Sequence, residues 1–405
     1  MRNGGEAGVR VALYSHDAMG LGHLRRNIAI SRALVESPLR ASVLILSGVR
    51  EAASVRLPER TDCLTLPSLH KQDDGSYRSR SLALGVPELI HMRSLAIRGA
   101  LESFAPHAFV VDKNPLGVFG ELEPALAHLA ATGQTRCVLG LRDVLDEPAV
   151  VEREWRKTRG TESVRRFYDA VWVYGDPAVY DPFLDVSGAA SVSSQLSFTG
   201  YLGPRPHALN PACEAVLRAR LDIPTGRIFL CLLGGGQDGW ELAARFAGAA
   251  LPEDAVGVIV TGPFMPPAAR RRLATAASLN PRLRVLEFVH EIEKLVAASD
   301  RIVAMGGYNT VCEVLAARKP LLLVPRVAPR REQAIRAERL EALGLAGVLL
   351  PDELATDKLD RWLVASHPEP DPSGIDLGGL PRIPALLASL LAETSEGGRV
   401  CAVSA

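Results

Sequence analysis

The sequence predicts an α/β fold built from two Rossmann-like, doubly wound parallel-sheet domains that face each other across a cleft. Three observations lead to this prediction. The chain has 405 residues, which suits two domains of about 200 residues each. Short apolar runs alternate with helical patterns in two successive arrays, and glycine-rich or polar loops directly follow several of these runs. Such alternation is typical of parallel sheets with crossover helices.

The first array begins near the N-terminus. Residues 9–15 and 41–46 are apolar runs, and residues 24–36 between them have helical spacing, so this segment predicts a βαβ unit. Further strands are expected at residues 108–111, 137–141 and 170–173. The polar, glycine-containing stretch 68–81 predicts a loop, and residues 91–104 return to helical spacing.

The pattern restarts after a Gly/Pro-rich stretch, GPRPHALNP, at residues 203–211. We expect this stretch to link an N-terminal domain, residues 1–203, to a C-terminal domain, residues 204–375. Strands of the second array are expected at residues 227–233, 257–261, 283–287, 301–304 and 320–324. Helices are expected at residues 240–250, 266–278, 291–298 and 310–317. A last helix, residues 382–393, is predicted to pack back on the first domain.

Composition argues against several classes of function. Lys+Arg and Asp+Glu both number 46, and the resulting zero net charge argues against a dedicated nucleic-acid binder. The six cysteines form no Cys-x-x-Cys or Cys/His cluster, so we expect neither a metal site nor a disulfide framework. No apolar run approaches the roughly 18 residues of a spanning helix, so a cytoplasmic protein without stable membrane insertion is expected.

The motif MGGYNTVCE directly follows the strand expected at residues 301–304. Glycines let the backbone approach a phosphate, and free N–H groups at a helix N-terminus carry the positive end of the helix dipole. One turn into the helix, Glu313 suits hydrogen bonds to ribose hydroxyls. On spacing alone, an alternative stays open in which Thr310-x-x-Glu313 is a capping box that only completes the helix. The candidate donor-binding residues here are Met305, Gly306, Gly307, Tyr308, Asn309, Thr310 and Glu313.

A second glycine-rich loop follows the strand expected at residues 227–233. Three consecutive glycines between a strand and a helix form a phosphate-sized concavity of backbone amides. The loop is neither a Walker A motif nor a dinucleotide fingerprint, and a plain tight turn is an equal alternative. The candidates from this loop and from the end of the next strand are Gly234, Gly235, Gly236, Asp238, Thr261 and Gly262.

Polar residues also gather between the first strand and the first helix, in the segment HDAMGLGHLRRN. The helix dipole disfavours an imidazolium at the helix entrance and leaves His23 as a neutral base. Arg25 and Arg26 suit contacts with anionic groups. The alternative is that His23 caps the helix while the arginines face water. The remaining candidates of this segment are His16, Asp17 and Gly22.

Other candidates in the first domain lie just after its strands: Asp112, Lys113, Arg142, Asp143, Tyr174 and Asp176. Each of the neighbouring pairs, Asp112 with Lys113 and Arg142 with Asp143, is open to two interpretations. Either the pair is only a salt bridge, or the carboxylate orients or deprotonates an acceptor. In the second domain, Arg330 and Arg336 suit a departing diphosphate, with a solvated basic helix face as the alternative.

Together these motifs resemble a known family. The Gly-x-Gly-His loop, the later glycine-rich loop and the Gly-Gly-x-x-Thr-x-x-Glu helix start resemble the GT-B transferases of glycosyltransferase family 28, which include the GlcNAc transferase of the peptidoglycan lipid intermediate. The chain resembles a group of predicted bacterial glycosyltransferases more closely. The segments that carry this resemblance, within residues 10 to about 350, are HDAMGLGHLRRN, VVDKNPLG, LGLRDVLDEP, VYGDPAVYD, MGGYNTVCE and PRVAPRREQ.

The resemblance implies inverting sugar transfer from a nucleotide-diphosphate sugar, most readily a UDP-sugar, without a metal or other cofactor. It implies that His23 is the base or an acceptor contact and that the glycine loops hold the diphosphate. Phe288 and Val289 match the loop that holds the base ring. Glu332 and Gln333 match the pair that contacts the sugar, which is usually Gln-Gln in the family, so the donor sugar stays open.

We therefore expect a nucleotide-sugar donor in the C-terminal domain and a small hydroxyl- or amine-bearing acceptor in the N-terminal domain. No nucleic-acid partner is expected, and a homodimer is compatible with the sequence. Two alternatives remain. The first is a nucleotide-sugar hydrolase or 2-epimerase of the same fold, and the second is a non-catalytic regulator that binds nucleotide sugars.

Overall fold

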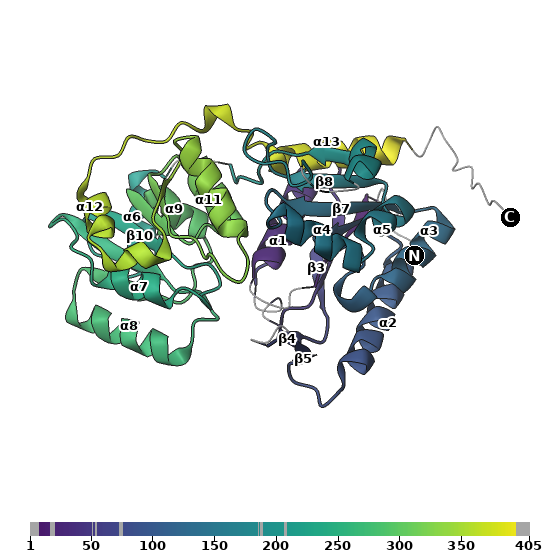
Figure 1. Cartoon of the computed structure of the whole chain (residues 1–405), viewed down its shortest axis with the longest axis horizontal. Helices are drawn as coiled ribbons and strands as arrows, with labels where there is room; N and C mark the ends of the chain where they lie inside the picture. Colours follow the sequence, from purple (N-terminus) through teal and green to yellow (C-terminus); the bar gives the residue numbers. More distant parts are fainter. Residues whose placement is uncertain are drawn as a thin grey trace.

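Two parallel sheets, each flanked by helices, form two lobes that lie side by side (Figure 1). The structure, a computed structural model, describes residues 8–16, 21–50, 52, 55–72, 76–184, 186, 189–205 and 209–393.

The N-terminal lobe contains a seven-stranded sheet in the order β3-β2-β1-β6-β7-β8-β9, in which all neighbouring strands are parallel. The central strands are almost fully buried, as the apolar runs of the sequence require. The strands are β1 (Arg10–Ser15), β2 (Ser42–Ser47), β3 (Thr61–Thr65), β6 (Ala108–Asp112), β7 (Arg136–Arg142), β8 (Ala170–Tyr174) and β9 (Leu196–Phe198). The helices are α1 (Gly22–Glu36), α2 (Val86–Phe104), α3 (Glu123–Thr132), α4 (Pro148–Lys157) and α5 (Gly160–Phe167).

The C-terminal lobe contains a six-stranded parallel sheet in the order β12-β11-β10-β13-β14-β15. Its strands are β10 (Arg227–Leu232), β11 (Ala255–Val260), β12 (Leu283–Leu286), β13 (Arg301–Ala304), β14 (Leu321–Leu323) and β15 (Gly347–Val348). Its helices are α6 (Pro211–Arg220), α7 (Trp240–Ala247), α8 (Pro267–Leu279), α9 (Ile292–Ala298), α10 (Tyr308–Ala316), α11 (Glu332–Ala342) and α12 (Lys358–Val364). The predicted fold class, two doubly wound parallel-sheet domains, is confirmed.

The last helix, α13 (Gly379–Ala392), crosses back and lies along the N-terminal lobe, where it packs against α1 (Figure 1). Backbone hydrogen bonds fix its approach: the Tyr201 N–H donates to the Asp376 carbonyl (2.7 Å), and the Gly379 N–H donates to the Tyr201 carbonyl (3.0 Å). The chain therefore crosses between the lobes twice, and the two crossings are hydrogen-bonded to each other.

One expectation was wrong in part. The stretch 68–81, predicted as a loop, contains an antiparallel hairpin of β4 (Leu69–Lys71) and β5 (Tyr77–Ser79). The hairpin is anchored by Leu69, which is buried in a small cluster with Leu89 and Val118. A single apolar anchor among polar residues gives no alternation that a strand prediction can use.

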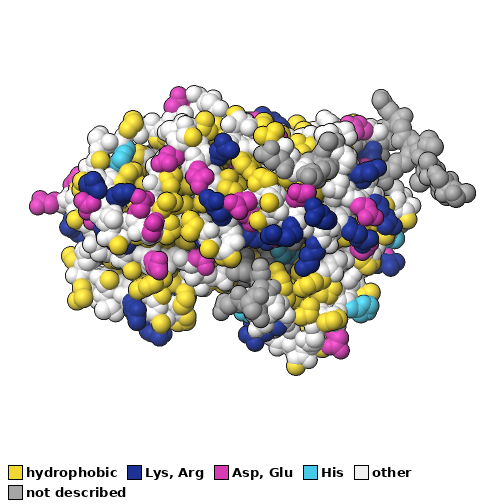
Figure 2. Space-filling model, viewed as in Figure 1, with side chains coloured by type: hydrophobic (Ala, Val, Ile, Leu, Met, Phe, Trp, Pro, Cys, Tyr) yellow, Lys and Arg dark blue, Asp and Glu magenta, His cyan; other side chains and the backbone are white. Residues whose placement is uncertain are grey.

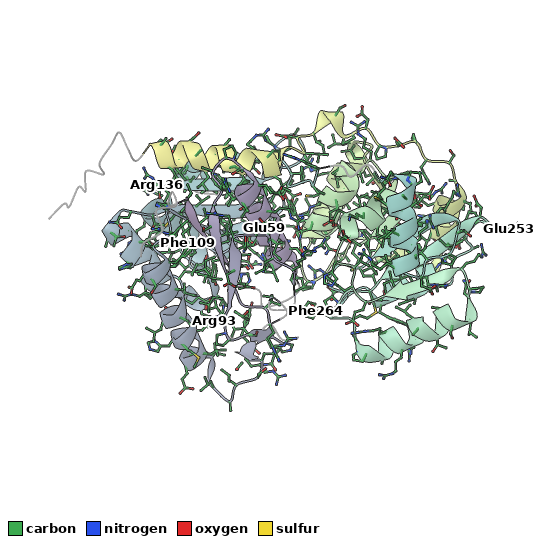
Figure 3. The ribbon with its side chains drawn as sticks, turned by 180° about the vertical axis from the view of Figure 1, so that it is seen from behind. Glu59, Arg93, Phe109, Arg136, Glu253 and Phe264 are labelled. Atoms are coloured by element: carbon green, nitrogen blue, oxygen red, sulfur yellow. The ribbon has the colours of Figure 1, made fainter. Side chains whose placement is uncertain are left out.

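A buried polar network stiffens the N-terminal lobe. The Arg93 guanidinium pairs with both oxygens of the Glu121 carboxylate, which also accepts a hydrogen bond from the Tyr14 hydroxyl. All three side chains are almost completely buried. Figure 3 shows Arg93 in the lower part of this lobe and Phe109 beside the sheet above it. None of the described helices is long and apolar enough to cross a membrane.

We predict that Gly140, in β7, is required for the packing of this sheet. A Cβ at residue 140 would lie 2.0 Å from the hydroxyl oxygen of the buried Tyr174 on β8. Gly140→Ala is therefore expected to lower the free energy of unfolding, measured by urea denaturation, by about 1–3 kcal/mol. Gly99→Ala in α2 is the control, since a Cβ there meets no atom within 4 Å. Equal stability of the two variants would contradict the prediction.

Candidate active site

The candidate residues of both lobes lie at the carboxyl ends of strands, on the edges that meet at the junction of the lobes. In doubly wound sheets this edge is where ligands bind. On the face shown in Figure 2, Lys, Arg, Asp and Glu side chains gather over this junction.

His23, the second residue of α1, contacts a carboxylate at the end of β6. The distance between His23 Nδ1 and Asp112 Oδ2 is 2.7 Å, and the Arg26 guanidinium donates to the same Asp112 oxygen. Burial alone raises the pKa of Asp112, but Arg26 and His23 outweigh it and hold that pKa well below its usual range. Asp112 is therefore ionised, and the alternative in which His23 only caps the helix does not describe these contacts.

His23 Nδ1 has two polar neighbours of opposite kind: it lies 2.7 Å from Asp112 Oδ2 and 2.9 Å from Arg26 Nη2. The ionised carboxylate only accepts hydrogen bonds and the guanidinium only donates them, so the first contact suits a hydrogen on Nδ1 and the second suits a lone pair there. In the neutral tautomer that is bonded to Asp112 the lone pair lies on Nε2, and this is the form in which Nε2 can act as a base. The side chain of His23 remains 15% exposed, whereas that of Asp112 is 2% exposed.

His16 lies close to this pair. Its ring centroid is 5.2 Å from that of His23, and burial, followed by the charges of His23 and Lys113, lowers its pKa well below the usual value. Its Nδ1 is buried without a hydrogen-bond partner in the described part of the chain. Asp17, predicted beside it, lies outside the described residues.

The starts of α1 and α10 touch across the junction. The Asn309 side-chain amide donates to the Gly22 carbonyl (2.9 Å), and Arg25 forms an ion pair with Glu313. Two helix N-termini, each the positive end of a dipole, thus point into one region. Burial raises the pKa of Glu313 against the opposing effect of Arg25, and Glu313 Oε2 is buried without a hydrogen-bond partner among the described residues.

The capping-box alternative for Thr310 and Glu313 was wrong. The N-cap of α10 is Gly307, which has no side-chain cap, and Thr310 is buried in the first turn. The first N–H groups of α10 are therefore not capped by a side chain. A Cβ at Gly307 would meet no atom within 4 Å, so there is open space beside these groups.

The glycines of the other predicted donor loop divide into two kinds. A Cβ at Gly236 would lie 2.1 Å from the Thr261 carbonyl oxygen, and one at Gly262 would lie 2.3 Å from the Gly234 carbonyl oxygen. These two glycines let the loops after β10 and β11 pack together. Gly234, by contrast, has φ +62° and open space at its Cβ position. Gly235 belongs to the same turn.

Several predicted donor residues contribute to packing instead of presenting polar groups. Val289 is buried beside the 39%-exposed Phe288, Met305 is half-buried, and Thr261 is fully buried. The buried Tyr308 stacks on Tyr201, with ring centroids 6.0 Å apart. Their predicted contacts with a nucleotide stay predictions.

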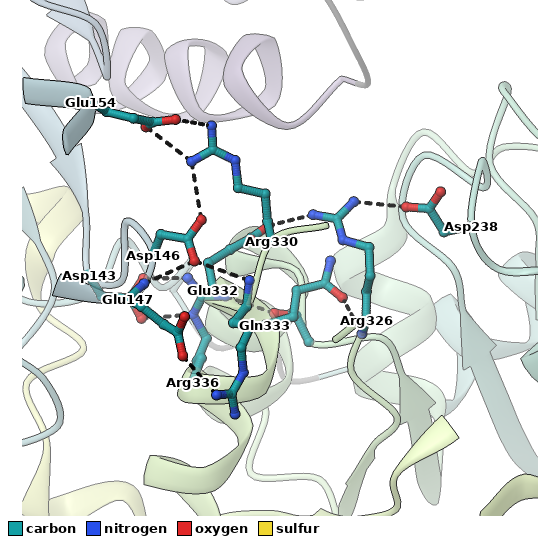
Figure 4. Close-up of polar contacts among 12 residues, drawn as sticks. Asp143, Asp146, Glu147, Glu154, Asp238, Arg326, Arg330, Glu332, Gln333 and Arg336 are labelled. Atoms are coloured by element: carbon teal, nitrogen blue, oxygen red, sulfur yellow. Dashed lines mark hydrogen bonds and ion pairs between the residues drawn. The ribbon is translucent and has the colours of Figure 1, made fainter. Parts of the chain in front are cut away.

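The predicted sugar-binding pair, Glu332 and Gln333, is hydrogen-bonded to Arg326, which the sequence analysis did not identify as a site residue. Arg326, in the loop after β14, donates to Glu332 (2.6 Å) and to Asp238 (2.8 Å), and its backbone N–H donates to Gln333 (3.0 Å; Figure 4). Burial opposes ionisation of Glu332, but Arg142 and Arg326 outweigh it and lower its pKa. Glu332 Oε2 is buried and has no hydrogen-bond partner among the described residues. The position of Arg326 just after a strand was a signal that could have revealed it.

Asp143 and Arg336 form a buried ion pair between the lobes. The guanidinium donates to both Asp143 oxygens, at 2.6 and 2.8 Å, and both side chains are 0% exposed (Figure 4). Arg336 also donates to the Gly306 carbonyl (2.9 Å), and the Tyr201 hydroxyl donates to Asp143 (3.0 Å). The alternative of a solvated basic face does not hold for Arg336. The base role of Asp143 stays a prediction, one that this arrangement does not favour.

A second group of ion pairs extends this contact. Arg330 donates to Asp146 (3.2 Å) and to Glu154 (3.0 Å), and the more exposed Arg331 pairs with Glu147 (2.8 Å; Figure 4). We call the pairs of Arg330, Arg331 and Arg336 with N-terminal-lobe carboxylates the interlobe clamp. Asp146 and Glu147 lie in the segment LGLRDVLDEP but were not singled out as site residues, and Glu154 lies in none of the predicted motifs.

The two remaining predicted acceptor contacts, Tyr174 and Asp176, are engaged with other parts of the protein. Tyr174 is buried beneath Arg26, whose guanidinium carbon is 5.9 Å from the ring centroid. Asp176 accepts backbone hydrogen bonds from Ala178 and Asp376, at 2.8 and 2.7 Å. Their roles in substrate binding stay predictions.

Comparison with known proteins finds a family match for part of the chain. Residues 258–371 match the glycosyltransferase family 28 C-terminal domain. The UDP-N-acetylglucosamine–N-acetylmuramyl-(pentapeptide) pyrophosphoryl-undecaprenol N-acetylglucosamine transferase of Agrobacterium fabrum is 29% identical over 210 residues, which cover 47% of this chain. The matched stretch spans 54% of that relative's length.

Solved structures share the fold. The glycotransferase of kitacinnamycin has a TM-score of 0.57 at 19% identity, with 96% of this chain and 98% of that chain covered. A Listeria monocytogenes protein assigned as a UDP-N-acetylglucosamine 2-epimerase has a TM-score of 0.53 at 14% identity, with 97% and 99% covered. Because transferases and an epimerase share it, the fold alone does not separate these activities.

The two lobes have the GT-B fold of these solved structures. Because residues 258–371 match the glycosyltransferase family 28 C-terminal domain, the resemblance predicted from the motifs is confirmed.

We predict that Lys113, the first residue after β6, lowers the free energy of unfolding, and that the size of this effect depends on pH. Burial, followed by the charges of Arg142 and Arg330, lowers its pKa to about 8, against Glu154 and Glu332, which raise it. Between this value and the unfolded pKa of about 10.4, the folded chain binds fewer protons, so the free energy of unfolding rises with pH. Lys113→Met is therefore expected to be more stable than wild type at pH 7.

The measurement is urea denaturation of both proteins from pH 7 to pH 10, over which the advantage of Lys113→Met should shrink. The exposed Lys157 provides the control, since Lys157→Met should show no such trend. An advantage of Lys113→Met that stays constant with pH would contradict the prediction.

Proposed function

We propose that this protein is an inverting, metal-independent glycosyltransferase that moves a sugar from a nucleotide-diphosphate sugar, most readily a UDP-sugar, to a small acceptor. One observation supports this above the others: the start of α1, with His23, contacts the start of α10, with its uncapped N–H groups, across the junction. A candidate base and a candidate diphosphate site therefore lie close together at the junction of the lobes.

Unpaired polar atoms gather in the same region. Asp112 Oδ1, Arg142 Nε, Glu313 Oε2 and Glu332 Oε2 are all buried without hydrogen-bond partners in the described part of the chain. Unsatisfied buried polar groups are costly unless a ligand or water completes them. A polyhydroxylated ligand with phosphates offers both donors and acceptors to such a set.

In the proposed reaction, the N–H groups at the start of α10 hold the diphosphate and stabilise its charge as it leaves. Glu332 and Gln333 contact the sugar, and Glu313 contacts the ribose once the bond to Arg25 is exchanged. His23 Nε2 takes the proton from the acceptor as the acceptor oxygen or nitrogen attacks the anomeric carbon. Asp112 then stabilises the imidazolium.

The proposal is tested by thermal-shift measurements with UDP, GDP, TDP and their common sugars, followed by mass spectrometry of the products with and without cell extract. Selective stabilisation by UDP and a UDP-sugar, with sugar addition that depends on the extract, supports the transferase. Free sugar released without an acceptor would favour the hydrolase or epimerase, and binding without turnover would favour a regulator. No response to any nucleotide would overturn the donor site.

We predict that His23→Gln keeps donor binding but loses turnover. Glutamine can still donate a hydrogen bond to Asp112, yet it has no basic nitrogen, so kcat should fall by about 10²–10⁴-fold. The Kd for UDP should change by less than about twofold. His128→Gln, on α3, is the matched control and should retain wild-type kcat. Full turnover of His23→Gln would exclude the base role.

We predict that Gly307→Val blocks the nucleotide without unfolding the protein. Gly307 has φ −62° and ψ 140°, which any residue adopts, and a Cβ there meets no protein atom within 4 Å. The added methyl groups would instead occupy the space beside the N–H groups of α10. UDP binding, measured by calorimetry, should be lost, with Tm nearly unchanged. Gly248→Ala, at the end of α7, is the control, and normal UDP affinity of Gly307→Val would contradict the diphosphate site.

A further inference from the structure

We infer that Lys113 and Arg142 form a site for a carboxylate or phosphate group of the acceptor, beside the position of the donor sugar. The inference rests on the proposed function and narrows the acceptor to anionic molecules. It begins with the position of the two residues. Arg142 ends β7, Lys113 follows the adjacent parallel strand β6, and the Lys113 N–H donates to the Gly140 carbonyl (2.8 Å). Both cations thus lie at the same edge of the sheet.

The carboxylates that adjoin these cations in sequence are engaged elsewhere. Asp112 binds Arg26 and His23 instead of Lys113. Asp143 binds Arg336 and Tyr201 in place of Arg142. The two local salt bridges that the sequence allowed are therefore not formed.

Among the described residues, neither cation has a side-chain hydrogen bond or ion pair of its own, and Arg142 Nε is buried without a partner. Their surroundings are electropositive. After burial, the charge of Arg142 has the largest lowering effect on the pKa of Lys113, and the charges of Arg26 and Arg336 lower the pKa of Arg142.

The acids that face this pair of cations already have partners. Glu154 is bonded to Arg330, and Glu332 accepts from Arg326. Burial of neighbouring like charges is unfavourable, and an anion between them offsets the cost. The planar guanidinium of Arg142 suits two-point binding of a carboxylate or phosphate, and the ammonium of Lys113 adds a point charge.

Glu332 indicates where this anion lies relative to the reaction. Its charge raises the pKa values of both Lys113 and Arg142, and it is the residue proposed to contact the donor sugar. An anion bound by the two cations therefore lies next to that sugar. The acceptor that fits is one whose anionic group is close to its nucleophilic hydroxyl or amine, as in a phosphorylated or carboxylated polyol.

The test is calorimetric binding of inorganic phosphate to the full chain saturated with UDP, which fills the nucleotide's own phosphate site. We expect one phosphate to bind. The variant that combines Lys113→Gln with Arg142→Gln should bind it at least about tenfold more weakly, which corresponds to about 1.4 kcal/mol. Lys157→Gln, on the exposed end of α4, should bind it as wild type does. Absence of phosphate binding, or equal binding by the double variant, would overturn the inference.

The same measurements distinguish failure of the proposed function from failure of the anion site. If UDP does not bind wild type, the donor site is wrong, and phosphate binding without UDP still decides whether the two cations hold an anion. If UDP binds normally and phosphate does not, only the anion site fails.

A second arm separates the acceptor from a charged donor sugar. Binding of UDP-glucose is compared with that of UDP-glucuronate, and transfer to glycerol is compared with transfer to glycerol 3-phosphate. We expect no preference for UDP-glucuronate and a preference for glycerol 3-phosphate that the double variant loses. A preference for UDP-glucuronate that disappears in the double variant would assign the anion to the donor and overturn the acceptor site.

Discussion

The buried ion pair between Asp143 and Arg336 is the interaction on which the rest of the site depends. It joins the end of β7 in one lobe to α11 in the other, and through the Gly306 carbonyl it also holds the turn that leads into α10. Because neither side chain is exposed, loss of one partner would leave the other charge buried and unpaired, which costs about 3–5 kcal/mol. The register of the two lobes, and with it the meeting of α1 and α10, is therefore fixed by polar contacts of defined geometry.

The pair also determines which charges remain available. Asp143 pairs with Arg336, and Asp112 pairs with Arg26 and His23, so among the described residues the cations beside these carboxylates in the sequence, Lys113 and Arg142, have no side-chain partner. The contact with Asp112 also orients the imidazole ring of His23. Pairing within the N-terminal lobe orients His23, and pairing between the lobes occupies Asp143.

The sequence predicted the strands and helices better than the side-chain contacts between them. Strands with fully apolar cores, such as β13, were placed at their observed bounds, whereas β3 was missed because exposed positions interrupt it. The rule that ligands bind at strand ends located the candidate residues. The partners were not predictable, since Asp143 and Arg336 are 193 residues apart and no local periodicity records which carboxylate meets which cation. The position of Arg326 just after a strand could have marked it as a candidate, but its bonds to Glu332 and Asp238 emerged from the structure.

The most direct test of this account is a crystal structure of the chain with UDP bound. The account predicts that the diphosphate lies against the backbone N–H groups of α10 beside Gly307, at the junction where α1 and α10 meet, with Asp143 and Arg336 still paired. A nucleotide bound away from the start of α10, or bound there only after the Asp143–Arg336 pair has separated, would contradict it.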